Sequence, residues 1–373
     1  LTLSSQNTYS GGTTVNNGTL DLVGQGIIDG VLTVDGSSSV VKLSGTSHNA
    51  VSGISSITVQ NGGTFTDNTP GTFVQSMPSV TIHNGGTLTS EAGSDGNPGF
   101  GNFLFTGALN VTGTGLATIS ANRIGFNYSK TVTVADTVAG AGTDLLISSS
   151  IRSDRFGTIT KEGAGTVELT NAGNTDTSPW VINNGSLKFN SAGEDFGTSG
   201  TLSASTGITV NSGGTLDVAN IWNTAENGSL TVDGGTLNFS VADDRNFVNN
   251  LTLNNGATVS ADASGGFRTG YFRDATITVG GSSASTISSK LLLADNGGAR
   301  EVTFNVADVT SDTGADLTVS GVISDLTNFE GADLIKTGAG TLALTAQNTY
   351  TGPTLVNEGT LILSGGGNRL SGG

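Results

Sequence analysis

Residues Lys336 to Gly365 read KTGAGTLALTAQNTYTGPTLVNEGTLILSG, and this stretch decides the fold because earlier parts of the chain repeat its pattern. Leu1 to Gly24 repeats Leu342 to Gly365 at a constant offset, and more than half of the aligned positions are identical. A more diverged copy runs from Lys161 to Asn190. Such reuse of a strand-rich unit is typical of a repeat array, so a catalytic site is not the first expectation.

The composition predicts many short strands joined by tight turns. Of the 373 residues, 58 are glycine and only 12% are charged, while Thr, Ser and Asn are abundant. Thr favours strands, whereas Gly and Asn favour turns. Because repeat proteins grow along one axis without a central core, the length does not set the number of domains.

The charge excludes some classes of partner. A net charge of −16 and a sequence pI of about 4.2 argue against nucleic acid and anionic membranes, which require a basic surface. Cysteine is absent, so disulfides and thiolate metal sites are excluded, although this assigns no compartment. No stretch approaches the roughly 20 apolar residues of a membrane helix, and no signal-peptide pattern is visible.

The first residue falls inside a repeat unit. Leu1 corresponds to Leu342, which follows the prefix Lys336 to Thr341. The copy at Lys161 keeps a similar prefix, Lys161 to Thr166. We therefore expect this chain to be a segment of a longer polypeptide.

A shorter motif recurs between the long units, with a local spacing of about 22 residues. It combines an apolar-Thr-apolar alternation with a following Asn-Gly or Gly-Gly pair. The alternation predicts aliphatic side chains on one face of a strand and Thr on the other. The five copies are Ile57 to Phe65, Val80 to Leu88, Ile208 to Leu216, Leu230 to Leu237 and Leu251 to Val259.

Two folds explain this motif. Asn-Gly between alternating segments is a strong hairpin signal, which favours an antiparallel meander or sandwich. The regular spacing of the motif instead favours one coil of a solenoid. We predict an all-β, right-handed parallel β-helix (β-solenoid) of roughly 16 coils of about 22 residues, continuous over residues 1–373. We also expect Asn at the repeated bends to stack into a ladder of amide hydrogen bonds.

The repeat units contain residues that we expect to be structural, because glycine permits bends that residues with a Cβ resist. The units lie near residues 1–24, 161–190 and 336–365. The predicted structural positions are Gly163, Gly165, Gly338, Gly340, Asn357 and Gly359.

The pattern K-x-G-x-G-T-L-x-L, followed by Asn348 to Thr354 and then V-N-E-G-T-L at residues 356–361, resembles the autotransporter-associated β-strand repeat, also called the passenger-associated transport repeat. The resemblance covers the three long units. It implies a β-helical passenger domain of a type V secreted protein, with a role in passage through the outer membrane and in folding outside the cell. The copy at Lys161 departs from the pattern at Asn174 to Trp180 and has one extra loop residue, so it is expected to serve only as a structural coil.

Catalysis has few candidate residues. Polysaccharide lyases and glycosidases with β-helices need grouped carboxylates or a basic residue with a metal. Asp243 to Arg245 and Arg152 to Arg155 are more simply read as solvated loops. His48 and His83 form no metal-binding pattern, and Asp95 to Gly99 lacks the acidic spacing of a calcium loop. We expect no catalytic residue, metal or cofactor.

Binding is the better functional candidate, because insertions in solenoids collect on one face. One departure from the short motif combines aromatic and basic residues, and we predict it as a binding site: Arg268, Tyr271, Phe272 and Arg273. Phe100 to Phe105 and Phe126 to Tyr128 are also aromatic-rich. Aromatic faces could hold sugars or a protein partner, although filling of a wider interior is the simpler interpretation.

The sequence therefore predicts a non-enzymatic, extracellular β-helical stalk of a bacterial surface or secreted protein, supporting adhesion or self-association. Its expected partners are further copies of the chain, through coil ends or lateral faces, or a glycan or cell-surface molecule. Membrane attachment would need a flanking domain. Two alternatives are a self-assembling extracellular filament and a carbohydrate-active β-helix enzyme.

Overall fold

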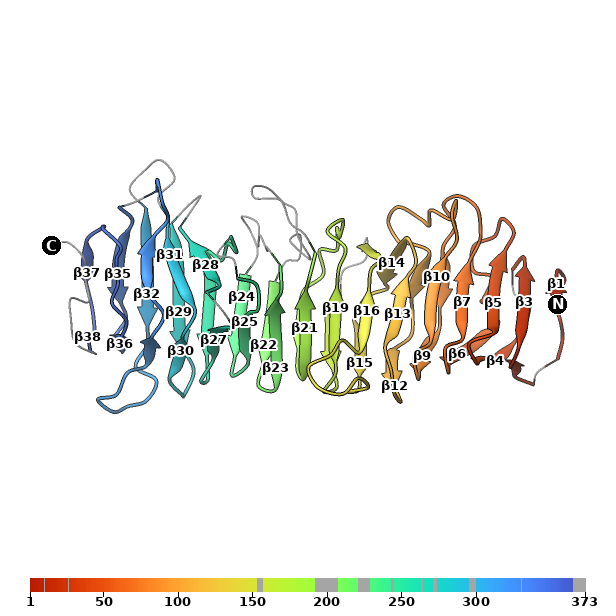
Figure 1. Ribbon diagram of the computed structural model, residues 1–373, viewed down its shortest axis with the longest axis horizontal. Coiled ribbons are helices and arrows are strands. Elements are labelled where there is room, and N and C mark those ends of the chain that lie inside the picture. Colours follow the sequence, from red (N-terminus) through yellow and green to blue (C-terminus); the bar gives the residue numbers. More distant parts are fainter. Residues whose placement is uncertain are drawn as a thin grey trace. The chain divides into compact units, whose positions relative to one another are not determined.

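The computed structural model describes residues 1–9, 11–25, 27–152, 157–191, 207–220, 229–242, 245–262, 264–270, 274–294, 300–329 and 331–364. All regular elements in these ranges are β-strands (Figure 1). Contacts divide the chain into a first unit, Leu1–Lys188, and a second unit, Phe189–Gly373. No helix of membrane-spanning length and hydropathy occurs in the described ranges.

The first unit contains strands of three parallel sheets. The strands of its first sheet are β1 (Thr2–Leu3), β3 (Gly18–Val23), β5 (Ser39–Ser44), β7 (Thr64–Asp67), β10 (Thr87–Ser90), β13 (Ala117–Ser120), β16 (Leu145–Ile147), β19 (Thr166–Leu169) and β21 (Gly185–Phe189), which ends at the unit boundary. Those of its second sheet are β2 (Thr13–Val15), β4 (Gly30–Asp35), β6 (Ile54–Gln60), β9 (Ser79–His83), β12 (Leu109–Thr112), β15 (Lys130–Val134), β18 (Ile159–Glu162) and β20 (Trp180–Ile182). Those of its third sheet are β8 (Gln75–Met77), β11 (Phe103–Phe105), β14 (Arg123–Phe126) and β17 (Ser150–Arg152).

The second unit repeats this arrangement. The strands of its first sheet are β23 (Gly214–Val218), β25 (Thr236–Phe239), β27 (Thr258–Ala261), β30 (Ser285–Ile287), β33 (Leu317–Val319), β36 (Thr341–Leu344) and β38 (Thr360–Leu363). Those of its second sheet are β22 (Gly207–Asn211), β24 (Ser229–Asp233), β26 (Asn250–Asn254), β29 (Ala275–Gly280), β32 (Glu301–Val306), β35 (Asp333–Thr337) and β37 (Thr354–Val356). Those of its third sheet are β28 (Gly266–Thr269), β31 (Lys290–Leu293) and β34 (Ile323–Asp325).

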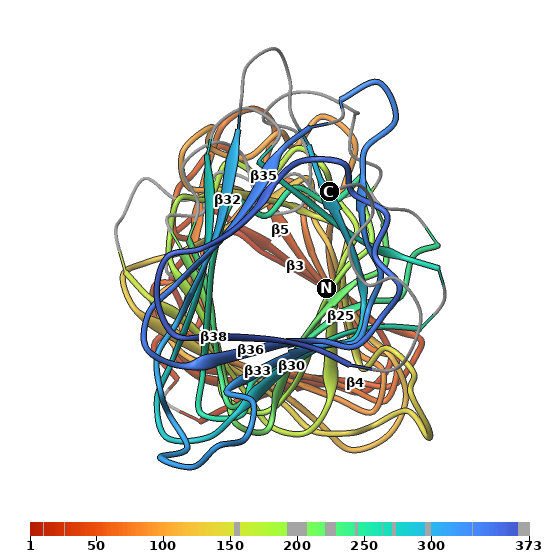
Figure 2. The same cartoon turned by 90° about the vertical axis from the view of Figure 1, so that its left-hand side faces the viewer.

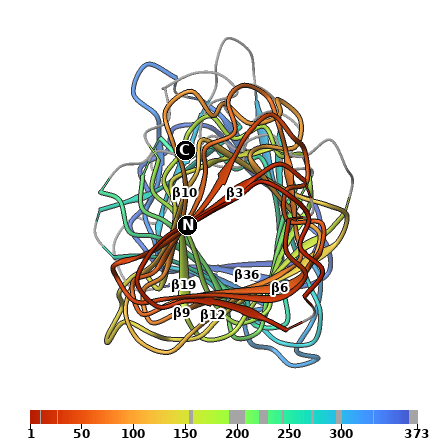
Figure 3. The same cartoon turned by 90° about the vertical axis from the view of Figure 1, so that its right-hand side faces the viewer.

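Consecutive strands of the chain enter different sheets, and each strand pairs in parallel with its counterpart one coil later. Figure 2 shows β30, β33, β36 and β38 of the second unit along one side of the coils, with β32 and β35 along another. Figure 3 shows the same separation in the first unit, where β9 and β12 lie apart from β3 and β10. This is a β-solenoid, so the predicted fold class is confirmed.

The coils are less uniform than predicted. Leu3 pairs with Leu22, whereas Ile287 pairs with Val319, so the second of these coils contains many more residues than the first. Among the described residues, eight such steps fall in the first sheet of the first unit and six in that of the second. The number of turns is therefore slightly below the predicted 16, because loops and third-sheet strands lengthen many coils beyond the expected period. Continuity of one solenoid across the unit boundary stays a prediction.

Aliphatic side chains stack in columns inside the coils. Strand pairing places Leu32, Ile57, Val80, Leu109 and Val132 in one register, and each is buried. The Thr residues that alternate with them lie on the outer face and are half-buried. Removing these apolar columns from water provides the main stabilisation of each unit, as the alternation predicts.

The Asn-Gly pairs form bends between sheets. Asn61 and Gly62 have φ of 54° and 79°, and Asn84 and Gly85 have 49° and 77°. Two successive positive φ values are also typical of a two-residue hairpin turn. Here, however, the strands on either side of Asn61-Gly62, β6 and β7, belong to different sheets. The antiparallel alternative is therefore wrong.

The predicted ladder of Asn side chains is confirmed. Asn61 Nδ2 donates to Asp35 Oδ1 at 2.7 Å, and Asn84 Nδ2 donates to Asn61 Oδ1 at 2.9 Å. The ladder continues where the backbone N–H of Thr114 donates to Asn84 Oδ1 at 2.7 Å. Hydrogen bonds from Asn61 and then Gln60 lower the pKa of Asp35. The bends at Asn61 and Asn84 are thus linked to neighbouring coils by their own side chains.

Candidate functional site

A buried lysine occupies the interior of each of the two later repeat units. Lys161 pairs with Val132, so it continues an aliphatic column and its side chain points inward. Its exposure is 0%. The ammonium donates to three backbone carbonyls: Glu162 O at 3.0 Å, Gly163 O at 2.7 Å and Asn184 O at 2.9 Å. All three N–H donors are satisfied, and they connect one coil to the next.

Lys336 makes the same contacts in the second unit. It pairs with Phe304, again within an interior column, and its exposure is 0%. Its Nζ donates to Thr337 O at 2.7 Å, Gly338 O at 2.6 Å and Glu358 O at 3.1 Å. The carbonyls come from corresponding positions of the two repeats. The lysine at the start of the repeat is therefore a buried structural residue and not a solvated side chain.

A buried aspartate accompanies each lysine. Asp144 Oδ1 accepts the backbone N–H groups of Thr137 at 2.5 Å and Val138 at 2.7 Å, while Oδ2 accepts that of Thr166 at 2.6 Å. These bonds close the loop that follows β15 and hold the start of β19. The carboxylate lies in a closed set of donors, so it stabilises the coil and is not positioned for acid or base catalysis.

Asp316 has the corresponding contacts in the second unit. Its Oδ1 accepts from Val309 N at 2.8 Å and Thr310 N at 3.1 Å, and its Oδ2 accepts from Thr341 N at 2.7 Å. Burial acts to raise the pKa of Asp316, but these hydrogen bonds outweigh it and the pKa is lowered. Together, Lys161 with Asp144 and Lys336 with Asp316 are named here the lysine clasps.

The predicted structural glycines line the clasps. Gly163 and Gly338 have φ of 81° and 77° and supply carbonyls to the lysines. A Cβ on Gly165 would collide with the backbone carbonyl oxygen of Ala135, and a Cβ on Gly340 would collide with that of Ala307; each would also lie 2.8 Å from the clasp carboxylate. Glycine is therefore needed for close approach at these two positions.

The last two predicted positions, Asn357 and Gly359, lie in the bend after β37. The backbone N–H of Asn357 donates to Lys336 O at 2.9 Å, while its side chain is exposed. Gly359 has φ of 73°, and a Cβ there would collide with the carbonyl oxygen of Gly338. Asn357 thus contributes through its backbone, and Gly359 through its missing side chain.

The charge of Lys161 makes the stability of the first unit depend on pH. Burial lowers its pKa from 10.5 to about 8, partly opposed by the charges of Asp144 and Glu162. Between these values the unfolded chain binds a proton that the folded chain has released, so stability rises with pH. We expect the free energy of unfolding, relative to that of Lys161→Met, to increase by about 2–3 kcal/mol over this window. Urea titrations of both proteins measure it, and a flat or falling difference contradicts it.

A second feature of the repeats is a pair of side chains at the corner before β37. Tyr350, which is 1% exposed, shares a hydrogen bond of 2.6 Å between its hydroxyl and Thr354 Oγ1. Tyr9 and Thr13 make the same bond at 2.8 Å in the first copy. Burial raises the pKa of Tyr350, so the phenol stays protonated at neutral pH.

The copy at Lys161 keeps this contact with exchanged residues. Asp176 stands where Tyr350 is expected, and Trp180 stands in place of Thr354. Trp180 Nε1 donates to Asp176 Oδ2 at 3.1 Å, and both residues are buried. The large and the small side chain have exchanged positions, and a hydrogen bond still joins them. The departure seen in the sequence therefore conserves the packing of the corner.

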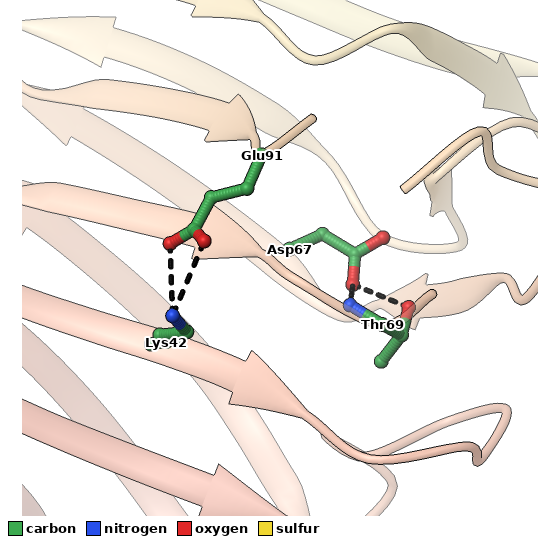
Figure 4. A network of polar contacts seen from close by, with 4 residues as sticks. All are labelled: Lys42, Asp67, Thr69 and Glu91. Atoms are coloured by element: carbon green, nitrogen blue, oxygen red, sulfur yellow. Dashed lines mark hydrogen bonds and ion pairs between the residues drawn. The ribbon is translucent and has the colours of Figure 1, made fainter. Parts of the chain in front are cut away.

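Figure 4 shows a polar cluster elsewhere in the first unit. Lys42 Nζ lies 3.1 Å from Glu91 Oε1, and both side chains are partly exposed, so the ion pair adds little stability. Asp67 is fully buried and accepts from the Thr69 hydroxyl at 2.6 Å and from Asn102 Nδ2 at 2.9 Å. These partners hold the loop after β7 against a later coil.

The predicted binding residues are only partly placed. Arg268 lies in β28, with its guanidinium carbon 5.6 Å from the centroid of the Phe247 ring. Tyr271, Phe272 and Arg273 lie outside the described residues, so the grouping of the four stays a prediction.

The other aromatic-rich stretches mostly fill the interior. Phe103 and Phe105 are 0% exposed and Phe126 is 2% exposed, with the rings of Phe105 and Phe126 stacked at 5.5 Å. The binding interpretation is therefore wrong for these three residues, because the third sheet widens the space that their rings fill. Phe100 is half-buried, and Tyr128 is 56% exposed.

The remaining candidates have local structural contacts. His48 Nδ1 accepts the backbone N–H of Val74 at 3.1 Å, and His83 Nδ1 lies 3.0 Å from Thr112 Oγ1. In the loop considered for calcium, Asn97 Oδ1 accepts the backbone N–H of Gly99 at 3.0 Å. The described ranges contain no group of three His, Cys, Asp or Glu residues that could hold a metal. Asp243, Asp244, Asp154 and Arg155 lie outside the described residues.

The lysine clasps are not among the predicted features, although the sequence contains a signal for them. In Ile159 to Glu162, apolar and polar residues alternate so that Lys161 falls on the inward position beside Ile159. Asp144 and Asp316 also stand in similar contexts, G-T-D-L and G-A-D-L, before their lysines. The alternation along the strand predicts a buried lysine, but its acceptors are backbone carbonyls, two from the bend directly after it and one from the next coil, and these have no sequence signature.

The repeat copies agree with a known family model. Residues 1–22, 159–189 and 334–363 each match the Passenger-associated-transport-repeat. These ranges include both clasp lysines and all three corner pairs. No curated protein and no solved structure shows a significant match to the chain.

Proposed function

We propose, from three passenger-associated transport repeats held in a β-solenoid, that this chain is a stalk segment of an autotransporter passenger displayed outside a bacterial cell. The observation that carries this proposal is the recurrence of the lysine clasp at Lys161 and Lys336. In two distant repeats, a buried lysine ammonium makes the same hydrogen bonds between coils. This pattern supports a role for the repeats in the integrity of the solenoid.

The architecture suits a stalk. Each coil pairs with the adjacent coils of its unit, so a unit can extend without enlarging its core. The outer faces carry Thr, Ser and Asn, and the net charge is −16, which favours solubility outside the cell. The chain has no cysteine, so its folding needs no disulfide. These features support a structural, non-enzymatic passenger at the cell surface or in the extracellular space, with adhesion or self-association as its activity.

Surface labelling tests the location. Antibodies against the purified chain should label intact cells of the organism that encodes it as strongly as permeabilised cells, with a cytoplasmic protein as the negative control. Protease treatment of intact cells should remove the label. Labelling only after permeabilisation would overturn the proposal. Sugar release from a polysaccharide panel by the purified chain would instead favour an enzyme.

A further inference from the structure

The third sheet of the first unit carries two arginines on its outer face. Arg123 pairs with Ser150, and Gly125 pairs with Arg152, so the two arginines are diagonal neighbours with side chains on the same face. Strand spacing places their Cα atoms roughly 8 Å apart. Gly125 lies between them, and the Phe100 carbonyl oxygen and the Leu104 side chain cover the place where its side chain would be, so a ligand would reach the guanidinium groups from above this cover.

Both arginines are anchored by neutral acceptors. Arg123 Nη1 donates to the carbonyl oxygens of Asp95 at 2.8 Å and Gly96 at 3.4 Å. Arg152 Nη1 donates to Thr175 Oγ1 at 2.9 Å, and its buried Nε has no hydrogen-bond partner among the described residues. The salt bridges of the described part of the chain join Lys42 to Glu91 and Lys188 to Glu168. Within that part, neither arginine has a carboxylate partner.

The strands of this sheet carry positive charge, and the nearest acidic residue in the contacts of Arg123 is Asp95, which binds it through its backbone carbonyl. Strands β8, β11, β14 and β17 contain two arginines and no acidic residue, although the chain has 30 acidic and 14 basic residues. Burial, and then the charge of Arg123, lower the pKa of Arg152. An anion between the arginines would relieve this repulsion and supply an acceptor for the guanidinium groups.

We propose that Arg123 and Arg152 form a binding site for a carboxylate or sulfate group of an acidic polysaccharide. The planar guanidinium presents paired N–H donors that match either group. A polysaccharide fits better than nucleic acid or an acidic peptide, because its acidic groups are separated by neutral sugar. The net charge of −16 repels a ligand with dense negative charge.

The second unit has a comparable arrangement. Arg268 of β28 pairs with Leu292, while Lys290 of β31 pairs with Gly266, which makes the two basic residues diagonal neighbours. Basic residues thus recur on the third sheet of both units. The inference deepens the proposed function, since it names a ligand class for a displayed stalk and rests on that display.

Three dextrans test the site. The purified chain is passed over surfaces of lightly sulfated dextran, lightly carboxymethylated dextran and neutral dextran, in which neutral sugars separate the acidic groups, at moderate ionic strength, which screens the net charge of the protein. We expect retention on at least one charged dextran and none on neutral dextran, and the two charged surfaces distinguish sulfate from carboxylate. Equal binding to all three, or no binding to any, would overturn the site.

Matched variants assign the binding to these residues. Arg123→Gln with Arg152→Gln should weaken the affinity about tenfold or more, as expected for lost charge-assisted hydrogen bonds. Lys42→Gln with Lys130→Gln removes the same charge from other sheets and should change the affinity less than about twofold. If the arginine and lysine variants lost the same affinity, net charge alone would explain the loss, and this would contradict a specific site.

A third variant and the choice of assays distinguish a loss of binding from a loss of folding or of surface display. Arg123→Lys with Arg152→Lys keeps the charge without the planar fork, so intermediate affinity at an unchanged Tm is expected. Wild-type affinity in that variant would contradict recognition through the guanidinium groups. Failure of the dextran assay leaves the surface labelling result untouched, and failure of surface labelling leaves the dextran result untouched. The two proposals can therefore fail independently.

Discussion

Gly185→Ala should destabilise the first unit by about 2–5 kcal/mol, as the sum of a backbone cost and an overpacking cost. Gly185 has φ of 65°, where an alanine costs about 1–2 kcal/mol. A Cβ there would also lie 2.5 Å from the carbonyl oxygens of both Gly163 and Gly165. Because these atoms belong to the backbone of the preceding coil, relief requires two coils to move apart, which adds an overpacking cost of about 1–3 kcal/mol. The same shift would disturb the carbonyls that hold Lys161.

Gly18→Ala is the matched control. Gly18 occupies the same position in the first repeat and has φ of 81°, but a Cβ there would meet nothing within 4 Å. The Gly18→Ala substitution should therefore lower the free energy of unfolding only by the backbone cost of about 1–2 kcal/mol. Urea unfolding followed by circular dichroism gives both free energies. Equal losses in the two variants would show that contact between coils does not decide the effect.

Lys161→Met should destabilise the first unit by about 3 kcal/mol at neutral pH, mainly through lost hydrogen bonds. Methionine fills the interior but leaves the carbonyls of Glu162, Gly163 and Asn184 without a donor. Each unsatisfied buried acceptor costs about 1–3 kcal/mol. Removal of a buried positive charge offsets part of that loss. Thermal and urea unfolding measure the net effect, and Lys336→Met should reproduce it in the second unit.

Lys130→Met is the control for this substitution. Lys130 lies in β15 of the same unit and donates only to the adjacent carbonyl of Ser129. Its replacement removes one positive charge without opening a buried cluster, so a change within about 0.5 kcal/mol is expected. If Lys161→Met is as well tolerated as Lys130→Met, the clasp does not stabilise the coil.

The candidate site was only partly predictable. The glycines of the K-x-G-x-G pattern were identified as structural, since repeated glycines at fixed spacing indicate tight bends. The lysine itself was not, because a charged residue beside a bend is normally solvated. Asp144 was missed for a different reason: it lies well before Lys161 in the sequence, and only the stacking of coils brings the two into one cluster.

The sequence by itself determined the class of fold. Apolar-Thr-apolar alternation fixes which side chains face inward, and the regular recurrence of the short motif favours stacked coils over hairpins. Both signals are local, so they can be read without knowing which strands pair. The Asn-Gly pair alone did not distinguish a hairpin from a solenoid, because the same positive φ values occur in a hairpin turn and in a bend between sheets.

Only the tertiary structure decided which residues meet across coils. Coil lengths vary with their loops, so sequence spacing does not give the register that places Arg152 beside Arg123 or Asn84 beside Asn61. The three carbonyl acceptors of each lysine are backbone atoms, which every residue possesses, and their convergence depends on the path of the chain. The periodic pattern therefore specifies a solenoid, while the packing of one coil on the next creates its clasps and its basic face.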